Sequence, residues 1–455
     1  MPMRHVIVGA GPAAQNAIET IRGLDADAEI ELVCDEPAYS RMVLPYYLMG
    51  DVPEAGLSTG DANWFEELRV TTRFGHRVVA LERDHDRVHL DDGTQLDFDR
   101  LLIATGSRPR RPDVPGAHGP GVVDLWTLAD ANSFLGAPHG DVVIVGAGFI
   151  AFTVLDAVAK RAKRVRFVEI EPRVLPRMLD PAAAAMVEAR LAAVGIEVHK
   201  GVPVEALEAA GGRQRLTLAG GATLECDLAV MATGIQANTE FLEGSGVELD
   251  QAILVDEQLR TSRTNIYAAG DVAQGPDLFG GPRRVQAIQP VAVDHGRVAG
   301  ANMAGAGIAY SGSLTVNILA AQGVEATSFG RWGEEGEVTV VANPASHIYR
   351  RYVFEEDRLV GGILVGPTLA VSGLNDVGML KGLVQTGVRL GPWKAYLSEN
   401  PMELRRVFVA SGAARELLES KLLAGRVTGG GYRFPRLPAR RPRPRHHASL
   451  VTGHT

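Results

Sequence analysis

The sequence predicts an α/β fold made of two similar α/β domains followed by a small α+β domain. Three observations support this prediction. The stretches "RHVIVGAGPAAQNAIETI" (residues 4–21) and "DVVIVGAGFIAFTVLDAVAK" (residues 141–160) repeat one pattern of buried strand, glycine turn and helix. From about residue 310 the pattern changes to short strands and then helices. A chain of 455 residues is also too long for one ordinary core and suggests roughly three domains.

Composition and charge narrow the class of protein. The chain is 46% hydrophobic and 22% charged, as in globular proteins, and its net charge of -8 argues against a nucleic-acid binder. We find no signal peptide and no transmembrane segment, so we expect a cytoplasmic protein. Cys34 and Cys226 lie far apart, and we expect both to be buried structural thiols. Neither the cysteines nor the histidines show metal-ligand spacing, so we predict no metal site.

The first strand–turn–helix unit has the features of a phosphate-binding turn. Gly9 permits the tight turn, Gly11 lets the backbone approach a pyrophosphate, and Ala14 lets the helix pack closely on the strand. The helix N-terminus then offers free amides and a partial positive charge. The following strand, "AEIELVCDEP", places Asp35 and Glu36 where a ribose hydroxyl needs an acceptor. Turn, helix and acidic pair together predict a Rossmann-like dinucleotide-binding domain.

The second unit repeats this arrangement. Gly146, Gly148 and Ala151 have the same spacing, Glu169 ends the next strand, and Glu171 follows it. Two such domains indicate two bound dinucleotides. The alternative is that one of the two turns is only a structural loop.

Three further strand ends complete the pattern. "LLIATGSRPRRP" (residues 101–112) and "LAVMATGIQAN" (residues 228–238) each break at an Ala-Thr-Gly turn, where small residues would let the chain pass between domains and touch a cofactor. In "TNIYAAGDVAQ" (residues 264–274), Asp271 stands at a strand end and suits a polyol hydroxyl. The alternative for Asp271 is a helix N-cap.

The two glycine turns, the two Ala-Thr-Gly turns and the Gly-Asp motif, in their order along the chain, resemble the flavoproteins with two dinucleotide-binding domains. That superfamily includes glutathione-reductase-like enzymes, ferredoxin and rubredoxin reductases, the flavin part of NADH nitrite reductases and apoptosis-inducing factor. The resemblance covers about residues 4–332 and looks nearest to the ferredoxin-reductase and nitrite-reductase type. There, "YSR" (residues 39–41) follows the first acidic pair, and "RRVQAIQPVAVDHGRVAGANMAG" (residues 283–305) follows the Gly-Asp motif. The implied organisation is a FAD-binding domain (1–112 and 245–309), a NAD-binding domain (113–244) and a C-terminal interface domain (310–425).

The resemblance implies which residues hold each cofactor. Around FAD we expect Gly9, Gly11 and Ala14 at the pyrophosphate, Asp35 and Glu36 at the ribose, Arg41 near the phosphates, Val79 at the adenine through its backbone, Arg110 nearby, Asp271 at the ribityl chain, and Gln286, Ala287 and Asn317 at the ring. Around NAD(P)H we expect Gly146, Gly148, Ala151, Glu169 and Glu171, with Gly234 beside the nicotinamide. A carboxylate accepts a bond from a 2'-hydroxyl and repels a 2'-phosphate, so the pair Glu169 and Glu171 favours NADH. Arg173 follows closely and could soften that preference.

The segment "RMVLPY" (residues 41–46) departs from its relatives in two ways. Thiol-using branches present a cysteine to the flavin here, whereas this chain has Met42, and a thioether cannot form a thiolate. Ferredoxin-reductase-like members often pair a lysine with a glutamate near the nicotinamide, and the matching places here are Tyr46 and Thr153. Because replacing both partners of a buried pair can be nearly neutral, we interpret Tyr46 and Thr153 as an adjusted catalytic site. The alternative is that Met42, Tyr46 and Tyr47 only pack.

The last third of the chain reads as a small α+β domain. "RYVFEEDRLVGGILVG" (residues 351–366) predicts a hairpin with its turn near Glu356 and Asp357. Residues 401–425 could form a helical stretch. The remainder, 426–455, is rich in proline and arginine and is predicted to be a disordered basic tail.

Together these features predict a FAD-dependent NAD(P)H oxidoreductase. Electrons would pass from NADH through the flavin, without a thiol relay, to a redox partner protein or subunit of the ferredoxin, rubredoxin or nitrite-reductase kind. One alternative is an NADH oxidase or quinone reductase that uses oxygen or a small acceptor. Another is a flavoprotein without turnover that serves as an assembly or signalling subunit. An oligomer is possible.

Overall fold

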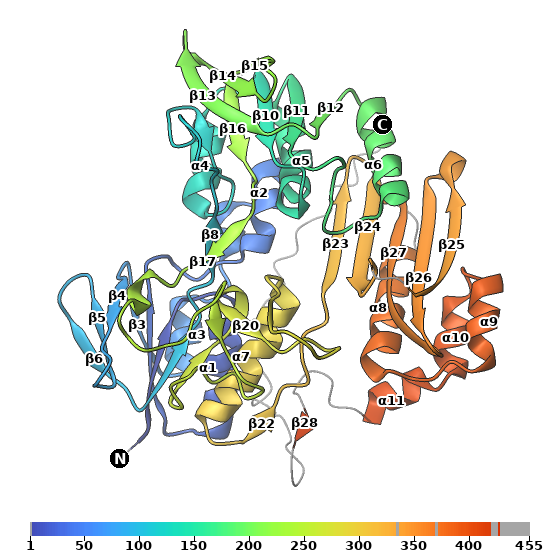
Figure 1. Cartoon of the computed structure of the whole chain (residues 1–455). Helices are drawn as coiled ribbons and strands as arrows, with labels where there is room; N and C mark the ends of the chain where they lie inside the picture. Colours follow the sequence, from blue (N-terminus) through green and yellow to red (C-terminus); the bar gives the residue numbers. More distant parts are fainter. Residues whose placement is uncertain (1, 334–335, 369–371, 420–425, 428–455) are drawn as a thin grey trace, which may run out of the picture.

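The computed structural model describes residues 2–333, 336–368, 372–419 and 426–427. Figure 1 shows three lobes, each containing a five-stranded sheet. The first lobe contains the N-terminus, the second lies above it in that view, and the third holds the C-terminal strands and helices. Two parallel sheets followed by an antiparallel sheet with helices confirm the predicted fold class: two Rossmann-like domains and a small α+β domain.

The first lobe is a parallel sheet covered by helices. In spatial order its strands are β19 (Ile266–Ala268), β7 (Arg100–Ile103), β1 (Arg4–Val8), β2 (Glu29–Cys34) and β3 (Val70–Phe74). Helices α1 (Pro12–Leu24) and α7 (Gln289–Met303) pack closely on each other. A Cβ atom at Gly296 would lie 2.1 Å from the carbonyl oxygen of Ala13, so this glycine allows the helix backbones to touch.

Smaller elements surround the first sheet. They are α3 (Ala62–Glu67), the three-stranded sheet of β4 (Val78–Leu81), β5 (Arg87–Leu90) and β6 (Gln95–Asp97), the three-stranded sheet of β18 (Ile253–Leu254), β20 (Ala273–Gly275) and β21 (Arg284–Val285), and the short helices η3 (Glu240–Leu242) and η4 (Gly270–Val272). Strand β22 (Ile308–Ala309) follows α7 and pairs with β28 (Arg426–Val427).

The second lobe repeats the strand pairing found at the centre of the first lobe's sheet. Its strands are β12 (Glu197–Lys200), β11 (Arg164–Glu169), β10 (Asp141–Val145), β16 (Leu228–Met231) and β9 (Val122–Val123), with helices α4 (Leu128–Gly136), α5 (Phe149–Arg161) and α6 (Pro181–Ala193), and a small sheet of β13 (Val204–Ala210), β14 (Arg213–Leu218) and β15 (Thr223–Cys226). Val145 pairs with Val168 as Val8 pairs with Val33, so the predicted internal repeat is confirmed.

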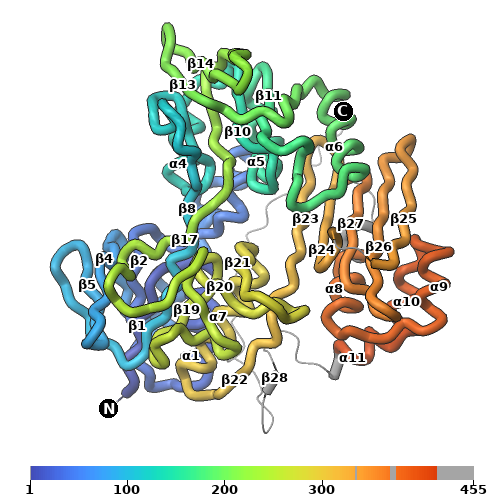
Figure 2. Tube along the Cα trace, viewed as in Figure 1, coloured from blue at the N-terminus to red at the C-terminus, as the bar shows by residue number. Residues whose placement is uncertain are grey.

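Two crossing segments join these lobes. Strands β8 (Ser107–Pro109) and β17 (Ile235–Ala237) follow the two Ala-Thr-Gly turns and pair antiparallel. Figure 2 shows them side by side between the first and second lobes. The prediction that the chain passes between domains at these turns is confirmed.

The segment that carries Met42 and Tyr46 reaches into the second lobe. It consists of η1 (Arg41–Val43), α2 (Leu44–Met49) and η2 (Glu54–Leu57). Leu44 and Leu48 belong to the same buried cluster as Leu155 of α5, and α2 packs against α5. The segment therefore follows a strand of the first lobe along the chain, but its apolar side chains pack in the core of the second lobe.

The third lobe is an antiparallel sheet backed by helices. Its strands are β23 (Val316–Ala321), β24 (Val324–Gly330), β27 (Arg358–Pro367), β26 (Ile348–Glu355) and β25 (Glu337–Asn343), with η5 (Pro344–Ser346) and the helices α8 (Ser372–Thr386), α9 (Pro392–Glu399), α10 (Leu404–Ala410) and α11 (Ala413–Glu419). Glu355 pairs with Arg358, which confirms the hairpin turn at Glu356 and Asp357. Helices α10 and α11 confirm a helical stretch up to residue 419. The predicted tail lies outside the described residues from 428 onward.

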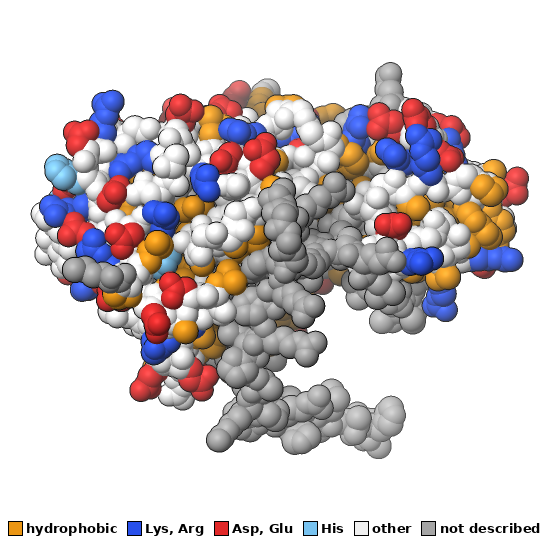
Figure 3. Space-filling view, turned by 90° about the horizontal axis from the view of Figure 1, so that it is seen from below, with side chains coloured by type: hydrophobic (Ala, Val, Ile, Leu, Met, Phe, Trp, Pro, Cys, Tyr) orange, Lys and Arg blue, Asp and Glu red, His pale blue; other side chains and the backbone are white. Residues whose placement is uncertain are grey.

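The described surface carries both signs of charge. Figure 3 shows basic and acidic side chains interspersed over the visible face of the first lobe. Among the described helices, none has the length and apolar character needed to cross a membrane.

Candidate functional site

The first glycine of each turn is required by its surroundings. Gly9 has φ +100° and Gly146 has φ +96°, conformations that L side chains rarely adopt. A Cβ atom at Gly9 would lie 2.2 Å from the oxygen of Ala104, and one at Gly146 would lie 2.4 Å from the oxygen of Ala232. Both turns are thus held tightly against the neighbouring strand.

The second glycine of each turn faces open space instead. Gly11 and Gly148 are the N-caps of α1 and α5, with φ of -74° and -88° that any residue could adopt. Within the described structure, a Cβ atom at either position would have no heavy atom within 4 Å. Glycine here keeps room in front of a helix N-terminus, which is the space that a pyrophosphate takes. The turns therefore fit FAD and a nicotinamide dinucleotide.

The third position of each motif packs as predicted. Ala14 and Ala151 are fully buried where the helix meets its sheet. A larger side chain at either position would push the helix away from the turn.

The first acidic pair is held by cations at the end of β2. The Asp35 carboxylate lies 2.6 Å from the guanidinium of Arg77. Glu36 accepts a hydrogen bond from the Tyr39 hydroxyl at 2.6 Å and one from Arg41 at 3.4 Å. Burial, together with Glu36, raises the pKa of Tyr39 to about 12, so its hydroxyl remains a donor. These contacts place Asp35, Glu36 and Arg41 together beside the first glycine turn.

Arg41 also links the first lobe to the crossing segment. Its guanidinium donates to the carbonyl oxygen of Ser107 at 3.3 Å and lies 5.6 Å from the ring centre of Trp126. The hydroxyl of Ser107 in turn donates to the Asp271 carboxylate at 2.7 Å. Burial raises the pKa of Asp271, and the Ser107 hydrogen bond and the Arg41 charge oppose that rise. Arg41 and Asp271, 230 positions apart in sequence, thus share one site.

Asp271 is not a helix N-cap. It lies inside η4, whose N-cap is Ala269, and its side chain bonds to Ser107 instead of a helix amide. The other interpretation of Asp271, that its carboxylate binds a polyol hydroxyl, fits this position.

A buried acceptor stands just before α7. Gln286 is 8% exposed, and its amide nitrogen donates to Asp277 and to the Ser313 carbonyl oxygen. Its amide oxygen has no hydrogen-bond partner among the described residues. Leaving a buried acceptor unpaired costs about 1–3 kcal/mol, so this oxygen is a candidate acceptor for a ring N–H of a bound cofactor. Ala287 follows it, half-buried, at the positive end of the helix.

The four remaining predicted contact residues lie in different parts of the chain. Val79 of β4, predicted to contact the adenine through its backbone, has a side chain that is 49% exposed. The Arg110 amide donates to the Gly234 carbonyl oxygen at 2.9 Å, where Gly234 has φ +110°. Asn317 is half-buried on β23 of the third lobe.

The second acidic pair divides into a buried and an exposed carboxylate. Glu169 is 5% exposed, and its two oxygens accept the amide of Ala147 at 2.6 Å and that of Glu171 at 2.9 Å. It thereby braces the glycine turn. The Glu171 side chain is exposed. Arg173 donates to the carbonyl oxygens of Leu179 and Pro176, so its guanidinium is engaged within its own loop.

Tyr46 and Thr153 lie on two helices that pack together, α2 and α5. The Thr153 hydroxyl donates to the Ile150 carbonyl oxygen at 2.7 Å, an ordinary backbone contact. Met42 is 51% and Tyr46 is 52% exposed, so simple core packing does not account for either. Tyr47 differs, because its hydroxyl donates to Asn132 at 2.6 Å and ties α2 to α4.

Both cysteines are described and neither forms a disulfide. Cys226 is buried, as predicted, but the prediction is wrong for Cys34, which is only partly buried at the end of β2. Burial raises the pKa of Cys226 to about 11, and burial also raises the pKa of Cys34. Neither thiol is activated, and neither lies on the segment of Met42.

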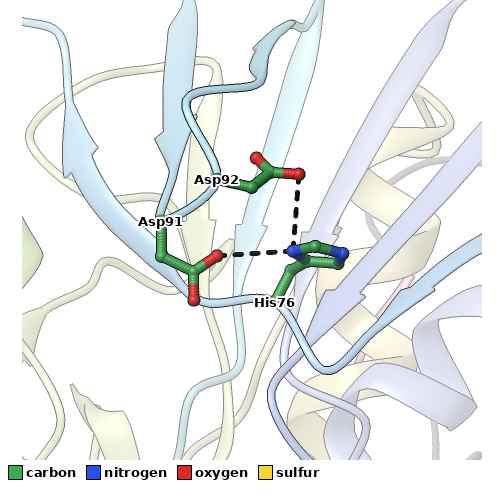
Figure 4. Close-up of side chains that lie close together, drawn as sticks. All are labelled: His76, Asp91 and Asp92. Atoms are coloured by element: carbon green, nitrogen blue, oxygen red, sulfur yellow. Dashed lines mark hydrogen bonds and ion pairs between the residues drawn. The ribbon is translucent and has the colours of Figure 1, made fainter.

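One cluster was missed by the sequence analysis. Figure 4 shows His76, which follows β3, facing Asp91 and Asp92 in the turn between β5 and β6. The ring Nδ1 lies 3.4 Å and 3.5 Å from the two carboxylates. These side chains meet because of how the strands fold back, so spacing along the chain gives no signal for the cluster. Asp91 and Asp92 are exposed and His76 is partly exposed, and the contacts of the imidazole ring with the two carboxylates account for the arrangement.

Comparison with known proteins identifies the family. Residues 3–296 match the pyridine nucleotide-disulphide oxidoreductase family. The chain belongs to that family. Residues 316–377 match the rubredoxin NAD+ reductase C-terminal domain, which agrees with the predicted branch.

Three similar proteins cover most of this chain. It is 32% identical to the NADH-dependent phenylglyoxylate dehydrogenase subunit epsilon of Aromatoleum evansii, over 89% of this chain and 96% of that protein. It is 34% identical to the rhodocoxin reductase of Rhodococcus erythropolis, over 68% of this chain and 74% of that protein. The crystal structure of a ferredoxin reductase from Rhodopseudomonas palustris matches with a TM-score of 0.73 and 29% identity, over 80% of this chain and 91% of that one.

These findings establish the class of chemistry. The protein is an oxidoreductase that uses FAD and NAD(P)H. When bound, the flavin supplies two-electron exchange with the nicotinamide. The chain itself supplies the open glycine turns, the carboxylates and the buried polar groups described above.

Proposed function

We propose that this protein passes electrons from NADH, through FAD, directly to a separate redox protein or partner subunit of the iron–sulfur or rubredoxin type. The observation that carries the proposal is Met42, which stands where a thiol relay would be, while Cys226 is buried, Cys34 is partly buried, and neither thiol is activated. Without a thiol relay, the flavin itself must hand its electrons to the acceptor.

The names of the relatives support an acceptor that is a protein. One relative, which matches 89% of this chain, is named as a subunit of an NADH-dependent dehydrogenase, and two others are named as a rhodocoxin reductase and a rubredoxin-NAD(+) reductase. We propose the same arrangement for this chain, with a partner that carries its own redox centre. We also propose that the protein works in the cytoplasm, where it would draw on NADH.

We propose that the second lobe prefers NADH to NADPH. Glu169 and Glu171 put two carboxylates at the end of β11, where a 2'-phosphate would be repelled. Arg173, the nearest following cation in sequence, is committed to the carbonyl oxygens of Leu179 and Pro176. We therefore propose that Glu171, exposed at this edge, accepts the ribose hydroxyl, and that Glu169 holds the turn in place.

We assign the remaining residues by their positions. FAD would take the turn of Gly9, Gly11 and Ala14, with Asp271 at its ribityl chain and Gln286 at its ring. The coenzyme would take the turn of Gly146, Gly148 and Ala151 and extend toward Gly234. Tyr46 would flank the nicotinamide from α2, with Thr153 below it on α5.

Two measurements test the proposal. In an anaerobic stopped-flow experiment, NADH should bleach the visible absorbance of the oxidised flavin. Under steady state, a ferredoxin or rubredoxin should then be reduced faster than oxygen is consumed. A variant with both Cys34→Ser and Cys226→Ser, once shown to fold and bind FAD, should retain this transfer. Oxygen consumption that outpaces every protein acceptor would contradict the proposal.

A further inference from the structure

One buried glutamine of the first lobe has a partner for every polar atom of its side chain. The amide nitrogen of Gln274, on β20, donates to the Asp250 carboxylate at 2.9 Å and to the Arg283 carbonyl oxygen at 3.2 Å. Its amide oxygen accepts hydrogen bonds from the backbone amides of Gln251 and Ala252. Gln274 is therefore fully bonded without any ligand.

Gln286, directly after β21, repeats this arrangement on its nitrogen but not on its oxygen. The nitrogen donates to the Asp277 carboxylate at 3.1 Å and to the Ser313 carbonyl oxygen at 3.2 Å. The side chain is buried, and its oxygen has no hydrogen-bond partner among the described residues. The strands that lead to the two glutamines, β20 and β21, lie side by side (Figure 2), so the contrast arises within one small sheet.

The two partners of the Gln286 nitrogen decide which end of the amide is left open. A carboxylate oxygen and a carbonyl oxygen can only accept hydrogen bonds, so both must face the NH2 group. Turning the amide over would place its oxygen against two acceptors and leave both of them unpaired. The open end is therefore the oxygen, and a ligand that binds there must offer a hydrogen-bond donor.

Asp277 and Ser313 are also fixed to each other. The Ser313 amide donates to the Pro276 carbonyl oxygen, and the Leu278 amide donates to the Ser313 carbonyl oxygen, each at 3.0 Å. The second oxygen of Asp277 accepts the Phe279 amide at 3.0 Å and so holds the turn. The two partners of Gln286 cannot move apart without breaking these backbone contacts.

A buried hydrogen-bond chain joins this frame to the turn that carries Asp271. The Gly270 amide donates to Nδ1 of His295 at 3.4 Å, so Nε2 carries the ring proton and donates to the Ser313 hydroxyl at 3.2 Å. Burial lowers the pKa of His295 to about 4, which keeps the ring neutral. The Ser313 hydroxyl also lies 2.9 Å from that of Tyr310. One frame thus links the proposed ribityl contact to the proposed ring contact.

We propose that Asp277 is a positioning residue for the flavin: it holds the Gln286 nitrogen, so that the Gln286 oxygen faces the ring N–H of FAD. The inference rests on the proposed function, because it takes FAD to bind in the first lobe with Gln286 at its ring. Oxidised flavin carries a ring N–H, which needs an acceptor once the ring is buried. Asp277 supplies that acceptor indirectly, by fixing the amide.

The test compares Asp277→Ser with the matched control Asp250→Ser. Serine is shorter than aspartate and releases the glutamine nitrogen in both variants, while its hydroxyl can still accept a turn amide. The Kd of FAD is measured from the flavin fluorescence that appears when the full-length holoprotein is diluted. We expect the Kd to rise about threefold or more in Asp277→Ser and to stay within about twofold in Asp250→Ser, where the Gln274 oxygen keeps its backbone partners.

Variants of Gln286 show whether Asp277 acts through the amide. Gln286→Leu should raise the Kd of FAD about tenfold. Adding Asp277→Ser to Gln286→Leu should change the Kd by less than about twofold, because no amide is left to position. Gln286→Glu tests the same contact without altering Asp277. Its carboxylate would face the Asp277 carboxylate and the Ser313 carbonyl oxygen, so FAD should bind more weakly than to Gln286→Leu. Thermal unfolding checks that each variant is folded.

The reduction potential of the bound flavin is a second readout, which a general loss of packing would not shift in a fixed direction. The Gln286 oxygen carries partial negative charge beside the ring and disfavours the electron-rich reduced flavin. Asp277→Ser and Gln286→Leu should therefore both raise the potential, and Asp250→Ser should leave it unchanged.

Three results would overturn the inference: equal FAD affinity in the wild type and Asp277→Ser, additive effects in the double variant, or FAD binding by Gln286→Glu as tight as by the wild type. Flavin reduction by NADH in the wild type is measured separately. If that reduction proceeds while Asp277→Ser behaves like Asp250→Ser, only the positioning role fails. If NADH does not reduce the flavin, the proposed function fails instead.

Discussion

The two glycines of each turn should respond to alanine substitution in opposite ways. Gly146→Ala forces a side chain into φ +96° and places its Cβ 2.4 Å from the oxygen of Ala232, well inside the 3.0 Å that real Cβ atoms keep. The backbone strain costs about 1–2 kcal/mol, and the overlap costs about 1–3 kcal/mol because β16 must shift. We therefore expect the free energy of unfolding to fall by about 3 kcal/mol.

Gly148→Ala should leave the fold intact and damage binding. Its φ of -88° suits alanine, and no described heavy atom lies within 4 Å of the new methyl group. The change in stability should stay within about 1 kcal/mol, the scale of an N-cap substitution. The methyl group would occupy the pyrophosphate space, however, and we expect the Kd for NADH to rise about tenfold or more, equivalent to about 1.4 kcal/mol.

The corresponding glycines of the first lobe, Gly9 and Gly11, show which lobe binds which cofactor. Gly11→Ala should lower the FAD content and leave the protein folded, whereas Gly9→Ala should destabilise the first lobe itself. Flavin absorbance measures FAD, calorimetry measures NADH binding, and thermal denaturation measures stability. If Gly148→Ala loses FAD but keeps NADH binding, the two lobes have been assigned to the wrong cofactors.

Three other predictions follow from single contacts. Glu171→Ser should narrow the preference for NADH over NADPH in the rate of flavin reduction without lowering the melting temperature, and an unchanged ratio would show that another group sets the preference. His295→Gln should reduce the loss of stability between pH 6.5 and 4. The pKa of His295 in the folded protein, about 4, lies below its ordinary value of 6.5, so the unfolded chain binds more protons than the folded one in that pH range. The free energy of unfolding therefore falls as the pH drops, by at most about 3 kcal/mol for this group. Urea unfolding at several pH values measures this, and equal slopes for the wild type and the variant would refute it. Tyr46→Lys with Thr153→Glu should show coupling of about 0.5–3 kcal/mol in the rate of flavin reduction by NADH, and strictly additive effects would show that the two positions do not meet.

The sequence was most informative where backbone geometry decides the structure. The glycine turns, the strands on either side of them and the hairpin at Glu356 and Asp357 all depend on local conformation, and the structure has each of them. The crossing of β8 and β17 follows from two Ala-Thr-Gly turns in the same way. Local signals of this kind do not depend on distant parts of the chain.

Contacts between distant residues were less predictable. Nothing along the chain shows that both oxygens of Glu169 accept backbone amides, because the Ala147 amide reaches it only once β10 and β11 pair. The hydrogen bond from Ser107 to Asp271 and the chain from Gly270 to Tyr310 arise likewise from tertiary packing. A pattern of residue types predicts that an acid is present, but not which of its oxygens is already bonded.

The segment of Met42 and Tyr46 is held by both dinucleotide-binding lobes. At its start, Arg41 is anchored to Glu36 and to the Ser107 carbonyl oxygen. At its end, the Met49 carbonyl oxygen accepts a hydrogen bond from Lys160 of α5 at 2.7 Å. A segment fixed at both ends has little freedom to bury exposed side chains by moving, so the half-exposed Met42 and Tyr46 are presented outward by the fold itself. Substitution of Tyr46 should therefore act on what enters the space between the lobes, the coenzyme first of all, and should have little effect on the core that Leu44 and Leu48 share with α5.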